Sequence, residues 1–251
     1  MSMIYFSLTP HTYAARFDNA IIILDSINDT YLSFIDSAAH YFQLVLSDSF
    51  TRNQDGKLTP INNDVDIEQL NYWITHFIEN NFIIESSQVH RKLIEPLPLK
   101  AGGLVEYRWD HKPSWKPFSK TSKIQILKAF FTLARIHYLL KRKGIAAILD
   151  AIKKNSTNRT LLRQPTEQEI NALATAVDAA SLIYPKKTYC LAWASTFVLL
   201  ALKKNWSCNL VIGIQTNPFY AHAWAEVTDK VIHDDPAIAE VLSIILKEPH
   251  T

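Results

Sequence analysis

Glycine is scarce in this chain of 251 residues, which has only five, at positions 56, 102, 103, 144 and 213. The phosphate-binding motifs GxGxxG and GxxxxGK[ST] need glycines at fixed spacings, and these five fit neither motif. The familiar glycine-rich nucleotide sites are therefore excluded, although other kinds of nucleotide site are not.

Cysteine is scarcer still, with only Cys190 and Cys208, too few for a disulfide scaffold. The sequence therefore favours reduced thiols, one of which could be reactive.

Long hydrophobic runs are also absent, because the longest uncharged one, Cys190 to Leu202, is shorter than the roughly 18 residues of a membrane span. No cationic segment precedes the first apolar residues, so a secretory signal is not predicted. These absences favour a cytoplasmic protein without a membrane partner.

Charge is unevenly distributed along the chain. Residues 1–85 carry three cations and eleven carboxylates, a formal net charge of −8, whereas residues 86–251 carry 23 cations and 13 carboxylates, a net of +10. With 48% apolar residues, the chain can bury the cores of about two domains. The charge division favours separate modules with separate partners, although both surfaces could simply be solvated.

The first module is predicted to contain short strands followed by helices. The predicted strands are residues 4–6, 12–17, 20–25 and 30–33, forming a β-meander, with a return strand at 82–84. Apolar residues at helical spacing predict one helix around Phe42 and a second over 67–78, capped by Asp64 or Asp66. This order favours an α+β fold that begins with a small winged helix-turn-helix.

A winged helix usually suggests DNA binding, but a module with a net charge of −8 would repel phosphates. Its strongly apolar strand, Ile21-Ile22-Ile23-Leu24, instead suits capture of an extended peptide by strand addition. The alternative is that this strand is covered and belongs to the core.

The middle of the chain is predicted to be a linker followed by a helical scaffold. Residues 86–120 are rich in proline and contain Gly102-Gly103, as is typical of a linker. Three helices are then predicted. The first begins at Ser122 and ends at the C-terminal glycine Gly144, the second covers 145–152, and the third begins with a capping box at Thr166.

Cys190 begins a strongly apolar helix directly after a segment that contains Lys186 and Lys187. A helix N-terminus and nearby positive charge both lower the pKa of a thiol, so a thiolate is expected near neutrality. Residues 210–214, 222–227 and 230–233 then read as strands, the last two forming a hairpin. A helix followed by an antiparallel sheet is the core order of papain-like and transglutaminase-like enzymes.

Such enzymes need a cysteine nucleophile, a histidine base and a group that orients the imidazole. Cys190, His222 and Asp234 can supply these groups. A hairpin with a three-residue loop would place Asp234 diagonal to His222, whereas a two-residue loop would set Asp235 opposite His222, so spacing does not separate the two acids. Cys208 is predicted to be structural. The absence of CxxC and HxxxH pairs disfavours a metal site.

Several runs of the sequence resemble known families. Tyr13-Ala14-Ala15-Arg16, Ile23-Leu24-Asp25 and Tyr31-Leu32 resemble the PqqD-like precursor-recognition element of ribosomal peptide maturation systems. Four further runs resemble the lasso-peptide B proteins, which are transglutaminase-like leader peptidases of bacteria. These runs are Cys190-Leu191, Leu210 to Ile214, Pro218 to Glu226 and Val231 to Asp234. His233 stands where that family often has an asparagine. The resemblance, in the order of the fused single-chain form, divides the chain into a leader-recognition module (1–85), a linker (86–120) and a peptidase domain (121–251).

The resemblance implies a cysteine peptidase that binds the leader of a lasso precursor peptide, with Ile21 to Leu24 as the edge strand, and cuts at the leader–core junction. A partner cyclase that spends ATP would then close the ring. No cofactor of this chain is implied beyond a possible dependence on ATP through that cyclase. One alternative is a non-catalytic chaperone that presents the leader to the cyclase. Another is a nucleic-acid regulator, which the negative charge of the first module disfavours.

Overall fold

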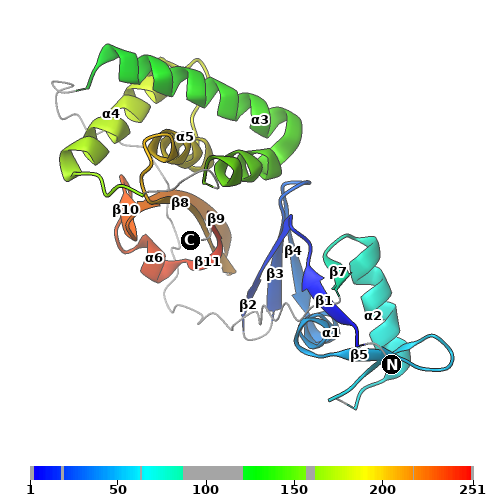
Figure 1. Ribbon diagram of the computed structural model, residues 1–251. Helices are drawn as coiled ribbons and strands as arrows, with labels where there is room; N and C mark the ends of the chain where they lie inside the picture. The colour runs from blue at the N-terminus through cyan, green and yellow to red at the C-terminus, as the bar shows by residue number, and fades with distance from the viewer. Residues whose placement is uncertain are drawn as a thin grey trace. The chain divides into compact units, whose positions relative to one another are not determined.

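The computed structural model describes residues 3–17, 20–62, 64–86, 121–156, 162–216 and 218–249. The chain divides into two compact units, Met1–Leu99 and Lys100–Thr251 (Figure 1). Of the predicted linker, only Ser86 is among the described residues, and it belongs to the last strand of the first unit. Among the described helices, none is both long enough and apolar enough to cross a membrane.

The described part of the first unit consists of short antiparallel strands and two helices. They are β1 (Tyr5–Leu8), β2 (Thr12–Arg16), β3 (Ala20–Asp25), β4 (Thr30–Ile35), α1 (Asp36–Ser47), β5 (Phe50–Arg52), β6 (Leu58–Pro60), α2 (Ile67–Glu79) and β7 (Ile83–Ser86). The predicted meander is confirmed for β2, β3 and β4. The first predicted strand is not part of it, because β1 pairs with β7, and the β5–β6 hairpin was not predicted.

Strand β3 is the central strand of the meander. It pairs with β2 on one side and with β4 on the other, and the side chains of Ile21 to Leu24 are at most 4% exposed. The prediction that Ile21, Ile22, Ile23 and Leu24 form an edge for an added peptide strand is therefore wrong. Their main-chain groups already serve two neighbouring strands, and their side chains fill the core.

The two helices of the first unit complete its core. Phe42 of α1 and Phe77 of α2 meet edge to face, with ring centroids 4.9 Å apart, and both pack on Phe34 of β4. Asp66 caps α2 by accepting hydrogen bonds from the amides of Glu68 and Gln69, which decides between the two predicted caps. Helix α2 therefore begins where the sequence predicts, and α1 contains Phe42 as expected.

Three helices open the described part of the second unit: α3 (Lys123–Ser156), α4 (Glu167–Ile183) and α5 (Cys190–Leu202). The predicted break at Gly144 is confirmed, since this residue has φ 65° and ψ −166° inside α3. Only glycine adopts that conformation without strain. The predicted capping box is also confirmed, with Thr166 and Glu169 bonding each other's main chain at the start of α4.

A four-stranded antiparallel sheet follows the helices, in the order β10-β9-β8-β11. Its strands are β8 (Cys208–Thr216), β9 (Phe219–Val227), β10 (Lys230–Ile232) and β11 (Ser243–Glu248), with the short helix α6 (Ile238–Val241) before β11. The first three strands agree with the sequence prediction. Neither β11 nor α6 was predicted.

Helix α5 lies at the centre of the second unit, between α3, α4 and the sheet (Figure 1). Every side chain from Ala192 to Leu202 is buried, which is why this helix is apolar on all sides. Because the helix is held all round, its first residue, Cys190, has a fixed position beside β9.

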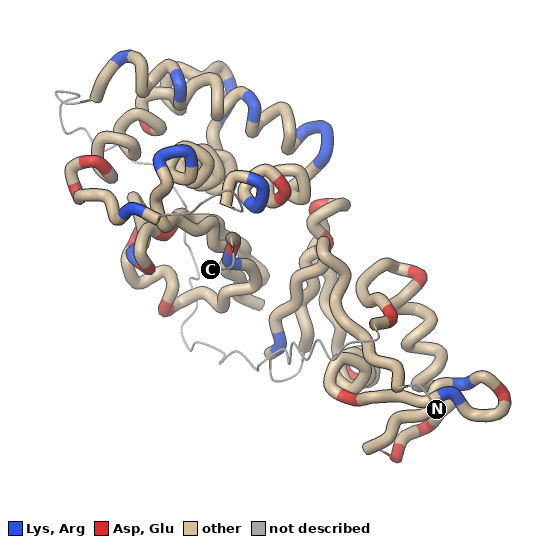
Figure 2. The backbone as a smooth tube through the Cα atoms, viewed as in Figure 1, with Lys and Arg blue, Asp and Glu red and all other residues tan. Residues whose placement is uncertain are grey.

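The distribution of charge agrees with the sequence. Figure 2 marks Lys and Arg positions along the backbone of α3, whereas the charged positions of the first unit are mostly Asp and Glu.

Candidate active site

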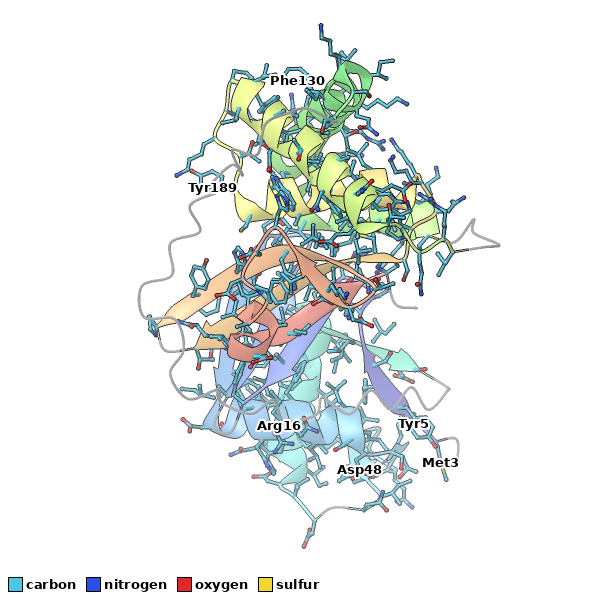
Figure 3. All side chains as sticks on the ribbon, turned by 90° about the vertical axis from the view of Figure 1, so that its left-hand side faces the viewer. Met3, Tyr5, Arg16, Asp48, Phe130 and Tyr189 are labelled. Atoms are coloured by element: carbon cyan, nitrogen blue, oxygen red, sulfur yellow. The ribbon has the colours of Figure 1, made fainter. Side chains whose placement is uncertain are left out.

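Cys190 is the first residue of α5 and is partly buried. The preceding residue, Tyr189, is exposed and projects from the surface (Figure 3). No side chain caps this helix. The main-chain N–H groups of its first turn, beside Cys190, have no carbonyl partner within the helix. The position therefore combines a thiol with an electropositive helix terminus.

His222 lies in β9 with only 1% of its surface exposed. Its side chain forms a hydrogen bond with Cys190, and its Nε2 lies 2.6 Å from Oδ2 of Asp234. Because Nε2 serves Asp234, Nδ1 is the nitrogen left to face the thiol. The structure thus brings together the three residues that the sequence predicts.

Asp234 reaches His222 by leaving the register of the sheet. The β9–β10 turn has two residues, Thr228 and Asp229, both with positive φ, and Val227 pairs with Lys230. Continued in register, β10 would set Asp235 opposite His222. Instead β10 ends at Ile232 and His233 takes φ 54°, which redirects the chain.

Asp235 is exposed and turns to the start of α6 instead of the histidine. Its Oδ1 accepts a hydrogen bond from the amide of Ala237 at 2.9 Å. The β9–β10 loop, whose length the sequence left open, therefore has two residues. A two-residue loop was expected to bring Asp235 to His222, but the acid that contacts His222 is Asp234.

The thiol and the imidazole shift each other's pKa. Burial raises the pKa of Cys190, but the hydrogen bond and charge of His222, with the amides of Ala223 and Leu191, outweigh it and lower that pKa. Burial likewise lowers the pKa of His222, whereas hydrogen bonds to Asp234 and Cys190 raise it, to about 9. The arrangement favours a thiolate beside an imidazolium.

The source of the positive charge beside the thiol differs from the one expected from the sequence. Lysines were expected to lower the pKa of Cys190, but Lys187 lies over the ring of Tyr189, with its Nζ 5.3 Å from the ring centroid. His222 supplies the charge instead.

Tyr220 is a neighbour of the site to which the sequence gave no role. Its hydroxyl lies 3.5 Å from Nδ1 of His222, and its ring stacks on the imidazole with centroids 6.2 Å apart. Burial, followed by the charges of Cys190 and Asp234, raises the pKa of Tyr220 to about 12. This phenol therefore stays protonated at neutral pH, beside the imidazole.

Asp178 of α4 also escaped sequence reasoning. It accepts a hydrogen bond from the indole of Trp193 and lies beside His233, the residue before Asp234. A signal was present, because Asp178 follows Val177 and lies one turn after Ala174, on a helix face that is otherwise apolar.

Cys208 begins β8 and is buried, as expected of a structural residue. Among the described residues, no group of three or more His, Cys, Asp or Glu side chains could hold a metal ion.

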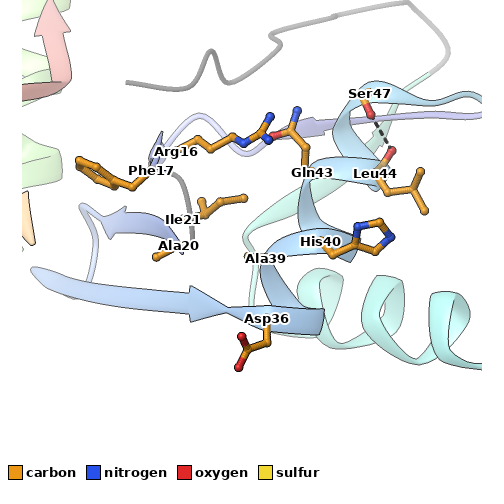
Figure 4. A pocket seen from close by; sticks show the side chains of 10 residues that line it. All are labelled: Arg16, Phe17, Ala20, Ile21, Asp36, Ala39, His40, Gln43, Leu44 and Ser47. Atoms are coloured by element: carbon orange, nitrogen blue, oxygen red, sulfur yellow. Dashed lines mark hydrogen bonds between the residues drawn. The ribbon is translucent and has the colours of Figure 1, made fainter. Parts of the chain in front are cut away.

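A separate pocket of about 530 Å³ lies in the first unit (Figure 4). Arg16, Phe17 and Ile21 line it from the β2–β3 side, and residues of α1 such as His40 and Gln43 line it from the other. The pocket contains none of the three residues of the predicted triad, so it is not the catalytic centre.

Comparison with known proteins decides the class of the second unit. Residues 132–246 match the transglutaminase-like superfamily, and this span includes Cys190, His222 and Asp234. Residues 132–246 are a transglutaminase-like domain.

The chain is also similar to the microcin J25-processing protein McjB of Escherichia coli. The two are 29% identical over 136 residues, which cover 52% of this chain and 62% of McjB. This similarity and the transglutaminase-like domain confirm the predicted resemblance to the lasso-peptide B proteins. No solved structure shows significant similarity to the chain.

Proposed function

We propose that this chain is a cysteine peptidase that binds the leader of a lasso precursor peptide and cleaves it at the leader–core junction. The observation that carries the proposal is the position of His222, which bonds Cys190 on one side and lies 2.6 Å from Asp234 on the other. The transglutaminase-like domain and the similarity to McjB support it.

In the proposed reaction, the thiolate of Cys190 attacks the scissile carbonyl carbon. The proton held by His222 passes to the departing amine as the carbon–nitrogen bond breaks, leaving a thioester on Cys190. His222 then takes a proton from water, the resulting hydroxide attacks the thioester, and the leader leaves as a carboxylic acid. Asp234 keeps the imidazole oriented and stabilises its positive charge throughout.

The start of α5 supplies one group for the transition state. The amide N–H of Cys190 is at the first helical position, where it has no partner within the helix. It can donate to the oxyanion that forms on the attacked carbonyl.

We assign leader recognition to the first unit, as a PqqD-like winged helix-turn-helix module. Since β3 is central, the strand that suits peptide addition is β4, at the edge of the meander. Four of its six residues are exposed, among them the apolar Leu32 and Ile35, whereas β2 is more buried. Main-chain bonds along β4 would give affinity and apolar contacts would give selectivity.

The proposal also sets the chain's partners. The substrate is the precursor peptide, and the amine released on the core is the group that a partner cyclase joins to a side-chain carboxylate. Any requirement for ATP belongs to that cyclase. Precursor, cyclase and peptidase would meet in the bacterial cytoplasm.

The proposal is tested by incubating the chain with a synthetic leader–core peptide and following the fragments by mass spectrometry. Cys190→Ala removes the nucleophile and should reduce cleavage by at least about 10³-fold. Cys208→Ala, which removes the buried thiol of β8, is the matched control and should cut at nearly the wild-type rate. Cleavage by Cys190→Ala as fast as by wild type would refute the peptidase.

A leader-binding chaperone is the alternative, favoured by the exposed apolar edge of β4. It predicts that the wild-type chain binds the leader but that no thioester on Cys190 is ever trapped. Detection of the acyl-enzyme by mass spectrometry would eliminate it.

A further inference from the structure

A buried carboxylate outside the proposed triad connects the two segments that carry the nucleophile and the orienting acid. Asp178 is only 4% exposed. Its Oδ1 accepts a hydrogen bond from Nε1 of Trp193 at 2.8 Å, and its Oδ2 lies 3.2 Å from Nδ1 of His233. Burial of a carboxylate is costly unless such partners compensate for the lost water.

Both partners of Asp178 are close in sequence to the proposed triad. Trp193 lies three residues after Cys190, on the same side of α5. His233 directly precedes Asp234. The rings of Trp193 and His233 also stack, with centroids 5.8 Å apart and an interplanar angle of 13°. One carboxylate therefore ties the helix of the nucleophile to the turn of the acid.

The turn at His233 needs support from outside itself. Its φ of 54° is in the left-handed region, which a residue with a Cβ adopts only at a cost. Without this conformation, β10 would continue in register and Asp235, not Asp234, would come opposite His222. The contacts of His233 with Asp178 and Trp193 favour the observed turn.

We propose that Asp178 is a positioning residue: by holding Trp193 and His233, it fixes the turn that places Asp234 on His222. The inference rests on the proposed peptidase function and extends it to a residue that touches none of the reacting atoms. Its consequence is that loss of Asp178 weakens the Asp234–His222 pair and hence the pairing of the imidazole with the thiolate.

The test compares full-length Asp178→Ala with wild type in two assays. Steady-state cleavage of a leader–core peptide gives kcat and KM. The rate of Cys190 alkylation by iodoacetamide, followed by mass spectrometry from pH 5 to 10, gives the midpoint of thiolate formation without any need for cleavage. We expect kcat to fall on the order of 10- to 100-fold with KM unchanged, and the alkylation midpoint to move to higher pH.

Glu248→Ala is the matched control. Glu248 is also a buried carboxylate, 2% exposed, and it pairs with a cation, Lys153, at 3.2 Å. Its loss should lower the melting temperature without moving the alkylation midpoint. Asp178→Asn retains an acceptor for Trp193, so it should recover part of the lost kcat and it replaces Asp178→Ala if the latter does not fold.

The results separate three cases. If the Asp178 variants lose stability as Glu248→Ala does, but keep the wild-type alkylation midpoint and kcat, Asp178 is only structural and the inference is wrong. If wild type does not cleave the peptide yet the midpoint shifts in Asp178→Ala, the peptidase proposal fails while the positioning role stands. A shifted midpoint together with a reduced kcat supports both.

Discussion

The thiol of Cys190 and the imidazole of His222 each favour the charged form of the other. Burial alone would keep both neutral, since it raises the pKa of the thiol and lowers that of the imidazole. The hydrogen bond and charge of His222, with two main-chain amides, reverse the effect on the thiol, and Asp234 together with Cys190 reverses the effect on the imidazole. An ion pair at rest is expected, so that attack on a carbonyl would need no prior proton transfer.

This pair predicts the pH dependence of cleavage. The rate constant kcat/KM should rise as the Cys190 thiol ionises, below its ordinary pKa, and fall as His222 loses its proton near pH 9. Asp234→Asn removes the carboxylate that raises the pKa of His222, so the alkaline limb should move to lower pH. Rates measured across pH 5 to 10 check this.

The control is Asp235→Asn, which changes the neighbouring acid and should leave the alkaline limb in place. An alkaline limb that does not move in Asp234→Asn would contradict the prediction.

The same raised pKa links His222 to stability. Its contribution to folding should be complete below about pH 6.5 and be lost as the pH rises through about 9.

At the scale of elements, periodicity in the sequence predicted most of the parts that carry the site. Helix α5 and strands β8 and β9 are long and apolar, so their burial shows directly in the sequence. The short strands β5 and β6 have three residues each, and β11 pairs with an irregular register between Ile244 and Leu246. Such elements give too few repeats of the pattern to be recognised.

The choice between Asp234 and Asp235 could not be predicted, because it depends on one torsion angle. The left-handed φ of His233 selects Asp234. Histidine adopts this conformation more often than most residues with a side chain, but still in a small minority of cases, so its presence does not predict the turn. The central position of β3 was also hidden, since a covered strand and an apolar edge strand have the same composition. Pairing partners, which decide between them, come from distant residues.

Close packing inside the second sheet gives an element-scale prediction. A Cβ at Gly213 would lie 2.7 Å from the ring of Trp224 and 2.8 Å from Cβ of Leu242. Because the ring of Trp224 stacks on His222, Gly213→Ala should both destabilise the fold, by about 1–3 kcal/mol, and reduce kcat. Urea unfolding and steady-state cleavage measure the two effects.

The control adds the same methyl group in the first unit. Gly56 has φ 77°, and a Cβ at this position would meet no atom within 4 Å, so Gly56→Ala should cost only backbone strain and leave kcat unchanged. An unchanged kcat in Gly213→Ala would show that the Trp224 ring does not set the position of His222.

At the scale of the whole molecule, recognition and catalysis are assigned to units of opposite charge. The residues of the first module sum to −8, which opposes binding to duplex DNA, and the rest of the chain sums to +10. The described core of the first unit is built from its own strands and helices. This division predicts that substrate affinity and chemical rate respond to different substitutions.

Leu32→Lys tests the division. Leu32 is 39% exposed on β4, and loss of its apolar contact should raise KM for a leader–core peptide about tenfold while kcat is unchanged. Ile27→Lys is the control, because Ile27 is 56% exposed in the turn between β3 and β4, outside the strand. Equal effects of the two substitutions on KM, or a fall in kcat with Leu32→Lys, would contradict leader addition at β4.

The order of strands in the second sheet sets when its core can close during synthesis. Strand β11, which leaves the ribosome after the other three strands, pairs with β8, the first of the sheet, and Leu242 just before it packs on Trp224. A nascent chain that already contains Cys190, His222 and Asp234 still lacks this closing strand. The proposed peptidase is therefore expected to gain activity only after β11 has left the ribosome and closed the sheet.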